Sequence, residues 1–360
     1  MVGINQLSLV QFRNYIKKEF NFTNRIVGIV GPNGIGKTNV LDALYYLSFT
    51  KSYFSRPDAQ NVHHAYQGLR IDGKYTIHKN EVTITCIIRE NLKKEFYFDE
   101  ELYAKHSQHI GKIPCVMIAP DDVQIITGAS EERRKLMDSL LCQINPTYLK
   151  YLIQYNKVLL QRNSLLKQAA ETDELDVLLL ETINEQLIEN GKPIHSYRTE
   201  LMEEWLPRVL NLYQHLAGQE DKINIQYQSL LTEQDFDSLL KQSLAKDKIL
   251  HRTNVGIHKD DLVITIQGQP FKQEASQGQR KSLLFALRLA EWEILKKYKG
   301  FAPILLMDDI FEKLDEQRML QLLEWVSKSS DGQVFITDTH KDRLTQLLGK
   351  HLNSYQLIEI

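Results

Sequence analysis

Residues 26–38 read Ile-Val-Gly-Ile-Val-Gly-Pro-Asn-Gly-Ile-Gly-Lys-Thr, an apolar segment that leads directly into a glycine-rich loop. The loop matches the pattern G-x-x-x-x-G-K-[ST] at each fixed position, and residues 39–47 carry apolar side chains at helical spacing. In such a strand–loop–helix unit, glycines let backbone N–H groups turn toward phosphates, and the helix start adds positive potential. A glycine-rich turn that matches by chance is the alternative, but the flanking segments favour a nucleoside triphosphate site. We therefore expect Lys37 to reach the terminal phosphates and the Thr38 hydroxyl to bind Mg²⁺.

Two carboxylates far along the chain are the expected partners of this loop. Asp308 and Asp309 directly follow the apolar residues 304–307. A phosphate loop of this kind needs an acidic residue at the end of a neighbouring buried strand to hold Mg²⁺. We expect Asp308 to coordinate the metal through water, and Asp309 to face the other way and orient or deprotonate the attacking water. The alternative is a plain turn or helix cap, but the presence of the loop favours the metal site.

The start of another predicted helix combines a structural signal with two local conflicts. Ser276 followed by Gln279 forms a capping box, which is a sufficient structural reason for both residues. Gly278 weakens a helix, however, and Arg280 and Lys281 place positive charge where the helix dipole disfavours it. An anion that docks at this end, with the glycine allowing its close approach, would explain both conflicts.

Composition excludes several classes of protein. The 360 residues carry 44 Lys and Arg against 46 Asp and Glu, so the chain is not a basic nucleic-acid coat. Any DNA contact must then come from a local cluster, such as residues 17–18, 133–135 or 296–299, although each cluster alone is better explained as solvated surface. Three cysteines without paired spacing indicate neither a disulfide framework nor a zinc site. No signal peptide and no apolar run of membrane-spanning length is found, so we expect a cytoplasmic protein with no membrane partner.

The periodicity of the sequence changes along the chain. Short alternating segments predict strands in the first part, and helical spacing dominates from about residue 130, with helices predicted over 148–170, 176–189 and 196–216. The last hundred residues alternate helices with short apolar strands, which predicts a helix-covered parallel sheet in an α/β fold. We therefore expect one domain formed by residues 1–125 and 250–360, with an inserted, mainly helical domain at 126–249.

Taken together, these motifs resemble the SMC/ABC-type ATPases. The phosphate loop, the Ser-Gln-Gly-Gln stretch at 276–279, the strand that ends in Asp308 and the Leu-Asp pair at 314–315 follow that family's order. The short helical insert, with segments 9–15, 130–138 and 256–262, is similar to the RecF family of bacterial DNA replication and repair proteins. The resemblance implies an ATPase head with a mixed sheet and flanking helices, plus the helical insert.

The resemblance also implies roles for individual residues. Those expected to bind ATP are Arg13, Asn14, Gly31, Asn33, Gly34, Ile35, Gly36, Lys37, Thr38, Asn39, Gln277, Gly278 and Gln279. Ser276 and Gly278 would reach the γ-phosphate bound by a second subunit, and Asp315 would lie in the loop that crosses this interface. Those expected to act in hydrolysis are Lys37, Ser276, Asp308, Asp309 and His340. His340 stands where ABC-type ATPases carry a switch histidine, although a plain strand-end histidine is an equal alternative. Gln124 is the nearest candidate for their glutamine loop, and an ordinary surface glutamine is the better interpretation.

The function implied by the resemblance is an ATP-dependent switch on DNA in recombinational repair and replication-fork maintenance. Binding of ATP and Mg²⁺ would drive homodimerisation at gapped DNA, where single and double strands meet, and slow, DNA-stimulated hydrolysis would release the dimer. The implied protein partners are RecR and the machinery that loads RecA. Asp309, where many ABC-type ATPases have Glu, fits a slow switch. The alternatives are an ATP-gated scaffold with little turnover and a small-molecule P-loop kinase, which would lack the Ser-Gln-Gly-Gln stretch.

Overall fold

A computed structural model of the chain describes residues 2–55, 57–218, 221–310, 316–328, 331–351 and 354–360. These residues form two compact units, each discontinuous in sequence. The first unit comprises Met1–Asp122, Leu212–Gln219 and Gln277–Ile360, and the second comprises Val123–Asn211 and Glu220–Ser276. Both chain halves therefore contribute to the first unit, which contains the phosphate loop and both carboxylates.

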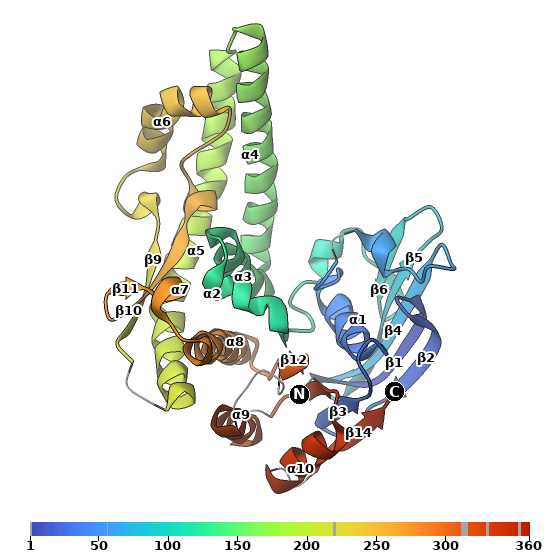
Figure 1. The fold of residues 1–360 in the computed structure, drawn as a ribbon. Helices are drawn as coiled ribbons and strands as arrows, with labels where there is room; N and C mark the ends of the chain where they lie inside the picture. The colour runs from blue at the N-terminus through green and yellow to red at the C-terminus, as the bar shows by residue number, and fades with distance from the viewer. Residues whose placement is uncertain (1, 56, 219–220, 311–315, 329–330, 352–353) are drawn as a thin grey trace. The chain divides into compact units, whose positions relative to one another are not determined.

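A five-stranded parallel sheet forms the centre of the first unit (Figure 1). Its strands are β3 (Ile26–Val30), β8 (Cys115–Ile118), β12 (Ile304–Met307), β13 (Val334–Asp338) and β14 (Gln356–Glu359). Their order is β14-β3-β13-β12-β8, and each neighbouring pair is parallel. Every residue of β3, β8, β12 and β13 is buried, and these strands are apolar except for Thr337 and Asp338 at the end of β13, as expected for a sheet covered on both faces. The order places β13 between β3 and β12, and all three end at the same edge.

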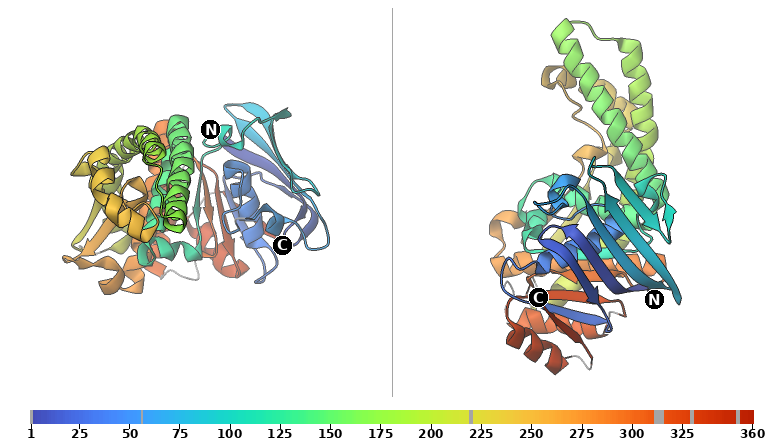
Figure 2. Two further views of the ribbon diagram at one scale, coloured as in Figure 1. Left: turned by 90° about the horizontal axis from the view of Figure 1, so that it is seen from above. Right: turned by 90° about the vertical axis from the view of Figure 1, so that its right-hand side faces the viewer.

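An antiparallel sheet forms the second layer of this unit. Its strands, in the order β2-β1-β4-β5-β6-β7, are β2 (Tyr15–Asn21), β1 (Val2–Phe12), β4 (Leu69–Ile77), β5 (Asn80–Ile88), β6 (Lys94–Phe98) and β7 (Glu101–Leu102). Helix α1 (Lys37–Phe49) contacts strands of both sheets and is buried along almost its whole length (Figure 2). The α/β class is as predicted. The parallel and antiparallel strands, however, lie in separate sheets, because the apolar helix α1 packs between them.

Three further helices complete the first unit. They are α8 (Gln277–Lys299), α9 (Glu316–Lys328) and α10 (Lys341–His351). Helix α8 packs on β8, and α9 contacts α10. Trp292 of α8 meets Trp325 of α9 edge to face, with ring centroids 5.2 Å apart. Cys86, Cys115 and Cys142 are free, buried thiols.

The second unit is mainly helical and includes a small antiparallel sheet. Its helices are α2 (Gln124–Thr127), α3 (Ser130–Ile144), α4 (Pro146–Thr172), α5 (Val177–Ala217, of which residues 212–217 belong to the first unit), α6 (Phe236–Leu250) and α7 (Phe271–Glu274). Its sheet has the order β11-β10-β9, from Gln269–Pro270, Asp261–Ile266 and Ile223–Gln228. Helices α4 and α5 run side by side as a long hairpin (Figure 1). Asn145 caps α4 through its side chain, with Pro146 in the first turn.

Two features of the second unit differ from the sequence interpretation. Helix α5 is continuous, where two helices were predicted at 176–189 and 196–216, because it passes through Pro193 and Pro207 without ending. Gly191 leaves room there for the Phe236 ring, since a Cβ at Gly191 would lie 2.6 Å from it. Residues 250–276, assigned above to the first domain, lie in the second unit because β10 pairs along its length with β9.

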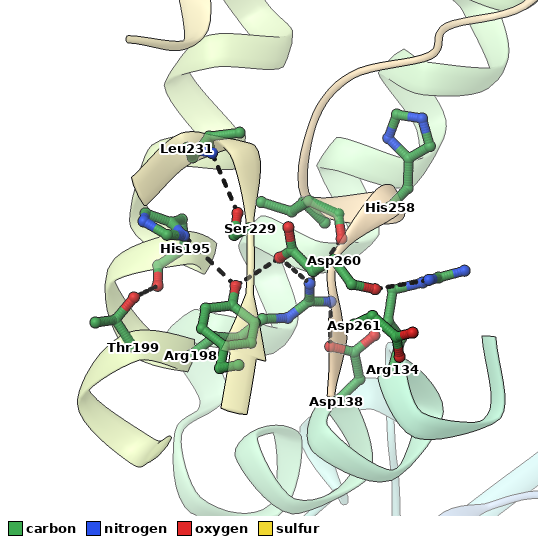
Figure 3. A network of polar contacts seen from close by, with 12 residues as sticks. Arg134, Asp138, His195, Arg198, Thr199, Ser229, Leu231, His258, Asp260 and Asp261 are labelled. Atoms are coloured by element: carbon green, nitrogen blue, oxygen red, sulfur yellow. Dashed lines mark hydrogen bonds and ion pairs between the residues drawn. The ribbon is translucent and has the colours of Figure 1, made fainter. Parts of the chain in front are cut away.

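A buried charge network holds the second unit together (Figure 3). The guanidinium of Arg198, on α5, donates to Asp138 of α3 at 2.8 Å and to Asp260 at 2.7 Å. Tyr227 of β9 also donates to Asp260, at 2.6 Å. The neighbouring Arg134 donates to the carbonyl of Asp260 at 2.7 Å. The two segments 130–138 and 256–262, noted above for their resemblance to one family, are thus in direct contact. Among the described residues, no helix has the length and apolarity needed to cross a membrane.

Candidate nucleotide-binding site

Two glycines of the phosphate loop adopt backbone conformations that other residues avoid. Gly34 has φ 79° and Gly36 has φ 119°. A Cβ on Gly36 would lie 2.6 Å from Asn14 Nδ2 and 2.7 Å from the Tyr15 hydroxyl, so there is no space for a side chain. Asn14 Nδ2 donates to the carbonyl of Ile35 at 2.6 Å, and the Tyr15 hydroxyl donates to that of Gly36 at 3.1 Å. The turn between β1 and β2 therefore holds the loop in place.

Lys37, the first residue of α1, is buried inside the loop. Its side chain curls back so that Nζ donates to the carbonyl of Gly31 at 2.9 Å and to that of Pro32 at 3.2 Å. Only 3% of the residue is exposed. The loop thus wraps around an ammonium group, with Asn33, Gly34 and Ile35 exposed at its tip. An incoming phosphate would meet this positive charge and the start of α1 together.

Thr38 and Asp308 are in direct contact, as the sequence predicts. Although 270 residues separate them, Thr38 Oγ1 lies 3.0 and 2.9 Å from the two carboxylate oxygens of Asp308. Thr337, at the end of β13, donates its hydroxyl to Asp308 Oδ1 at 2.8 Å and accepts the Asp309 N–H at 2.8 Å. Because β13 lies between β3 and β12, its last residues bridge the groups that follow those two strands.

The electrostatics of Asp308 fit a cation site. Burial raises the pKa of this carboxyl to about 6, although the hydroxyl groups of Thr337 and Thr38 partly offset the effect by donating to it. A hard cation such as Mg²⁺ prefers oxygen ligands, and here one hydroxyl and one carboxylate converge. The described residues contain no cluster of three or more His, Cys, Asp or Glu side chains that could hold a metal alone. A divalent ion at this place would complete its ligand set with phosphates and water, so the donor set fits Mg²⁺ bound to a nucleotide.

Strand alternation was expected to turn Asp309 away from Asp308, but the backbone at Asp309 is set in another way. Strand β12 ends at Met307, so strand alternation does not extend to Asp309. Its backbone instead turns through the left-handed region, at φ 42°, and its N–H is held by Thr337. The predicted role of Asp309 in orienting water remains a prediction, and Thr337 is the group that fixes its backbone.

Of the other residues expected at the nucleotide, Asn14 and Asn39 lie together, with Asn39 Nδ2 donating to Asn14 Oδ1 at 2.7 Å. Arg13 instead points to α1 and the residues after it, where its Nη2 donates to Asp42 of α1 at 2.8 Å and to Ser52 at 3.1 Å. Asp42 is buried, with 1% of its side chain exposed. A nucleotide contact by Arg13 remains a prediction and would have to compete with this ion pair.

The Ser-Gln-Gly-Gln stretch lies at the start of α8, which begins at Gln277, and Ser276 and Gln277 are exposed. The structure gives a reason for glycine at position 278 that the sequence did not indicate. A Cβ there would lie 2.9 Å from the guanidinium of Arg318, which leaves no space for a side chain. Arg318 Nε donates to the Ser282 hydroxyl at 2.8 Å, which ties α9 to the first turns of α8. The roles of Ser276, Gly278 and the first-turn Gln279 toward a second subunit remain predictions.

His340, Asp315 and Gln124 are the other residues to which the resemblance assigned or suggested a role. His340 is exposed just before α10, and its N–H donates to Asp338 Oδ1 at 2.7 Å. Asp315 lies outside the described residues. Gln124 begins α2 in the second unit. The proposed basic cluster at 133–135 is largely neutralised, because Arg133 pairs with Asp261 at 2.6 Å and Lys135 pairs with Glu132 at 2.6 Å.

Thr337 and Tyr15 are the site residues that the sequence interpretation missed. Thr337 follows an apolar strand, so a hydroxyl at a strand end was visible in the sequence. Its contact with Asp308 depends on β13 lying between β3 and β12, and no local pattern gives that order.

Comparisons with known proteins agree with this geometry. Residues 3–356 match the family described as RecF/RecN/SMC N terminal domain. The chain is 44% identical to the DNA replication and repair protein RecF of Flavobacterium johnsoniae, over 99% of both chains, and 38% identical to that of Parabacteroides distasonis, over 99% of this chain and 97% of the other. It is also similar to a solved structure of the recombination mediator protein RecF with ATP in the RecFOR pathway, with 29% identity and a TM-score of 0.87 over 94% of this chain and 92% of that one. An Smc head bound to the C-winged helix domain of ScpA shares the fold, with a TM-score of 0.57 at 14% identity over 99% and 94% of the chains.

Proposed function

The chain belongs to the RecF/RecN/SMC N-terminal domain family, and from this membership we propose that it is an ATP-driven switch on DNA in replication and repair. Relatives that match it over nearly their full length are named DNA replication and repair protein RecF. The first unit is the proposed ATPase head, and the second unit is the proposed helical insert. The contact between Thr38 and Asp308 carries the proposal, because two groups 270 residues apart meet at a phosphate loop.

ATP and Mg²⁺ are the proposed cofactors of the head. When bound, the nucleotide and its metal supply the phosphoryl group and the charge neutralisation that hydrolysis requires. Lys37 would exchange its two carbonyl partners for phosphate oxygens, and Thr38 and Asp308 would hold the metal. Asp309, positioned by Thr337, would orient water for attack on the γ-phosphate. Its short side chain suits slow turnover.

The proposed switch needs a second copy of the chain. Ser276 and Gly278 of one subunit would contact the γ-phosphate held by the other, so that ATP closes the homodimer and loss of phosphate opens it. The exposed position of Ser276 and Gln277 at the start of a long helix supports this role. We propose gapped DNA as the ligand of the closed dimer. RecR and RecA loading are the proposed downstream partners, in line with the RecFOR pathway named for the solved relative.

A mixing experiment tests the shared site. Lys37→Arg and Ser276→Arg should each abolish turnover, because each removes one half of every composite site. An equal mixture should recover about a quarter of the wild-type rate, since half of the dimers are mixed and each mixed dimer has one intact site. A mixture as inactive as its components would mean that the two motifs do not meet across a dimer.

The dependence on DNA is measured in the same assay. We expect the ATPase rate to rise faster than linearly with protein concentration, and to increase with gapped DNA in a salt-dependent way. A rate that is linear in protein and indifferent to DNA would contradict the switch. Sedimentation with a non-hydrolysable ATP analogue tests dimerisation itself. The ATPase rate then separates a switch from a scaffold, because a scaffold would dimerise without turning over ATP.

A further inference from the structure

The second unit contains a hollow of about 570 Å³ between α4 and the chain that follows α6. Its lining residues come from two places: Leu160, Asn163, Ser164 and Lys167 on α4, and Leu250, His251 and Arg252 at the end of α6 and just after it. None of them belongs to the nucleotide site described above. The volume is within the range of sites that take small ligands or the side chains of a bound peptide.

Buried polar contacts join the two segments that line this hollow. Arg162 and Asp247 form an ion pair at 2.7 Å with both side chains fully buried, and Arg162 also donates to the Thr253 hydroxyl at 2.9 Å. Asn163 Oδ1 accepts from both the N–H and the hydroxyl of Thr253, each at 2.8 Å. Helix α4 is therefore bonded to the segment that forms the opposite wall, and the hollow exists before any partner binds. Preformed sites of this kind lose little freedom on binding.

The walls of the hollow expose large aliphatic side chains. Leu160 is 70% exposed and Leu250 is 42% exposed, and the adjacent Ile249 is 76% exposed. On the same helix α4, Leu166 is almost fully buried, at 1%. Apolar surface gathered beside a hollow gains free energy when another apolar group covers it.

The rim of the hollow is positively charged. Lys167 and Arg252 line it, and Lys246 and Lys259 are exposed on the same part of the chain. Burial, followed by the positive charges of Arg252, Arg134 and Lys246, lowers the pKa of Lys259, as expected for cations gathered close together. The nearby Asp247 is already bonded to Arg162. In the part of the chain that the structure describes, Lys167, Lys246, Arg252 and Lys259 form no ion pair.

We propose that this hollow docks an acidic peptide segment of a partner protein, with one large apolar side chain of the peptide seated against Leu160 and Leu250. Carboxylates of the segment would pair with Lys167 and Arg252, while the apolar side chain covers the exposed leucines. Charge complementarity and the aliphatic walls support this partner together. A nucleic acid would use the cations and leave the leucines uncovered, and the lining has no Phe, Tyr or Trp on which bases could stack.

A display library of short random peptides, selected against the full chain, tests the proposal. We expect the retained peptides to combine Asp and Glu with at least one Leu, Ile, Met or Phe. Labelled copies of these peptides are then measured by fluorescence anisotropy. The double variant Leu160→Glu/Arg252→Glu should weaken their binding by at least about tenfold. Both side chains are exposed, so the variant is expected to fold normally, and circular dichroism checks this.

A matched control has the same charge change on the same unit. Leu178 is 75% exposed and Lys157 is exposed, and neither lines the hollow. The double variant Leu178→Glu/Lys157→Glu should bind the selected peptides as the wild type does. Equal losses in both double variants would overturn the proposal, as would selection of basic peptides or of none. A short single-stranded oligonucleotide that binds more tightly than the selected peptides would overturn the proposal in favour of nucleic acid, if its binding is lost in Arg252→Glu but kept in Leu160→Glu.

Discussion

Asp308→Asn should stabilise the nucleotide-free protein while removing the response to Mg²⁺ and ATP. The carboxylate is 4% exposed, and burial raises its pKa from 3.8 to about 6. Such a shift corresponds to about 3 kcal/mol of destabilisation when the group is charged. Asparagine keeps a carbonyl oxygen that accepts from Thr38 and Thr337, but it adds an amide that needs new partners at a cost of about 1–2 kcal/mol. We therefore expect a net gain of about 1–2 kcal/mol at pH 8.

The sign of the pH dependence follows from the same shift. The folded-state pKa is raised, so the cost of the charge is fully present above about pH 6 and disappears as the pH falls below the unfolded value of 3.8. The advantage of Asp308→Asn should therefore be greatest at pH 8 and fade between pH 6 and pH 4. Urea unfolding followed by tryptophan fluorescence measures it, with Trp292 and Trp325 reporting on the first unit and Trp205 on the second.

Addition of Mg²⁺ and ATP should reverse the order of the two proteins. At a hundred times its dissociation constant, a ligand stabilises the folded wild type by about 2.7 kcal/mol, whereas the variant has lost one of the two groups expected to hold the metal. Asp338→Asn is the matched control, because Asp338 is equally buried at a strand end but pairs with Arg343 at 2.7 Å. It should lower stability by about 1–2 kcal/mol with and without nucleotide. If Asp308→Asn behaves in the same way as this control, the cation-site interpretation of Asp308 is refuted.

Two further substitutions address the groups around this site and the second unit. Thr337→Val keeps the shape of a fully buried side chain but removes the hydroxyl that joins Asp308 to Asp309. In steady-state assays, kcat for ATP hydrolysis should therefore fall about tenfold with little change in KM. A change confined to KM would argue against a role of Thr337 in positioning Asp309. Arg198→Leu leaves Asp260 buried without its counter-charge and should cost about 3–5 kcal/mol of stability. Adding Asp260→Asn to the same chain should restore part of this loss, as measured by thermal unfolding with circular dichroism. An unchanged unfolding midpoint in Arg198→Leu would show that the network does not stabilise the second unit.

The meeting of Thr38 and Asp308 could be predicted because each lies in a local pattern with a fixed geometry. The loop follows an apolar strand and opens a helix, and Asp308 closes another apolar strand. Parallel strands end at one edge, so the two patterns imply a common site. The order of the strands in the sheet could not be predicted from the sequence, because it depends on which apolar segments pack together in the folded chain. The role of Thr337 was missed for that reason.

Contacts between distant polar residues were also beyond the sequence. The basic cluster at 133–135 was a candidate for DNA, but Arg133 pairs with Asp261, 128 residues away. Nothing local in either segment marks such a pair. Two helices were predicted where α5 is one. Gly191 and Pro193 are ordinary signs of a helix end, but the helix continues through both, with Phe236 packed over Gly191. Tertiary packing overrides local propensity at such positions.

The most direct test of the central site is a change of metal preference in Thr38→Cys. A thiol at position 38 is a poor ligand for Mg²⁺ and a good one for a soft ion such as Cd²⁺. If Thr38 and Asp308 hold one ion, ATP hydrolysis by this variant should be lost with Mg²⁺ and restored with Cd²⁺, and adding Asp308→Asn should abolish the restored activity. Full activity of Thr38→Cys with Mg²⁺, or restoration by Cd²⁺ that does not depend on Asp308, would contradict a shared metal site.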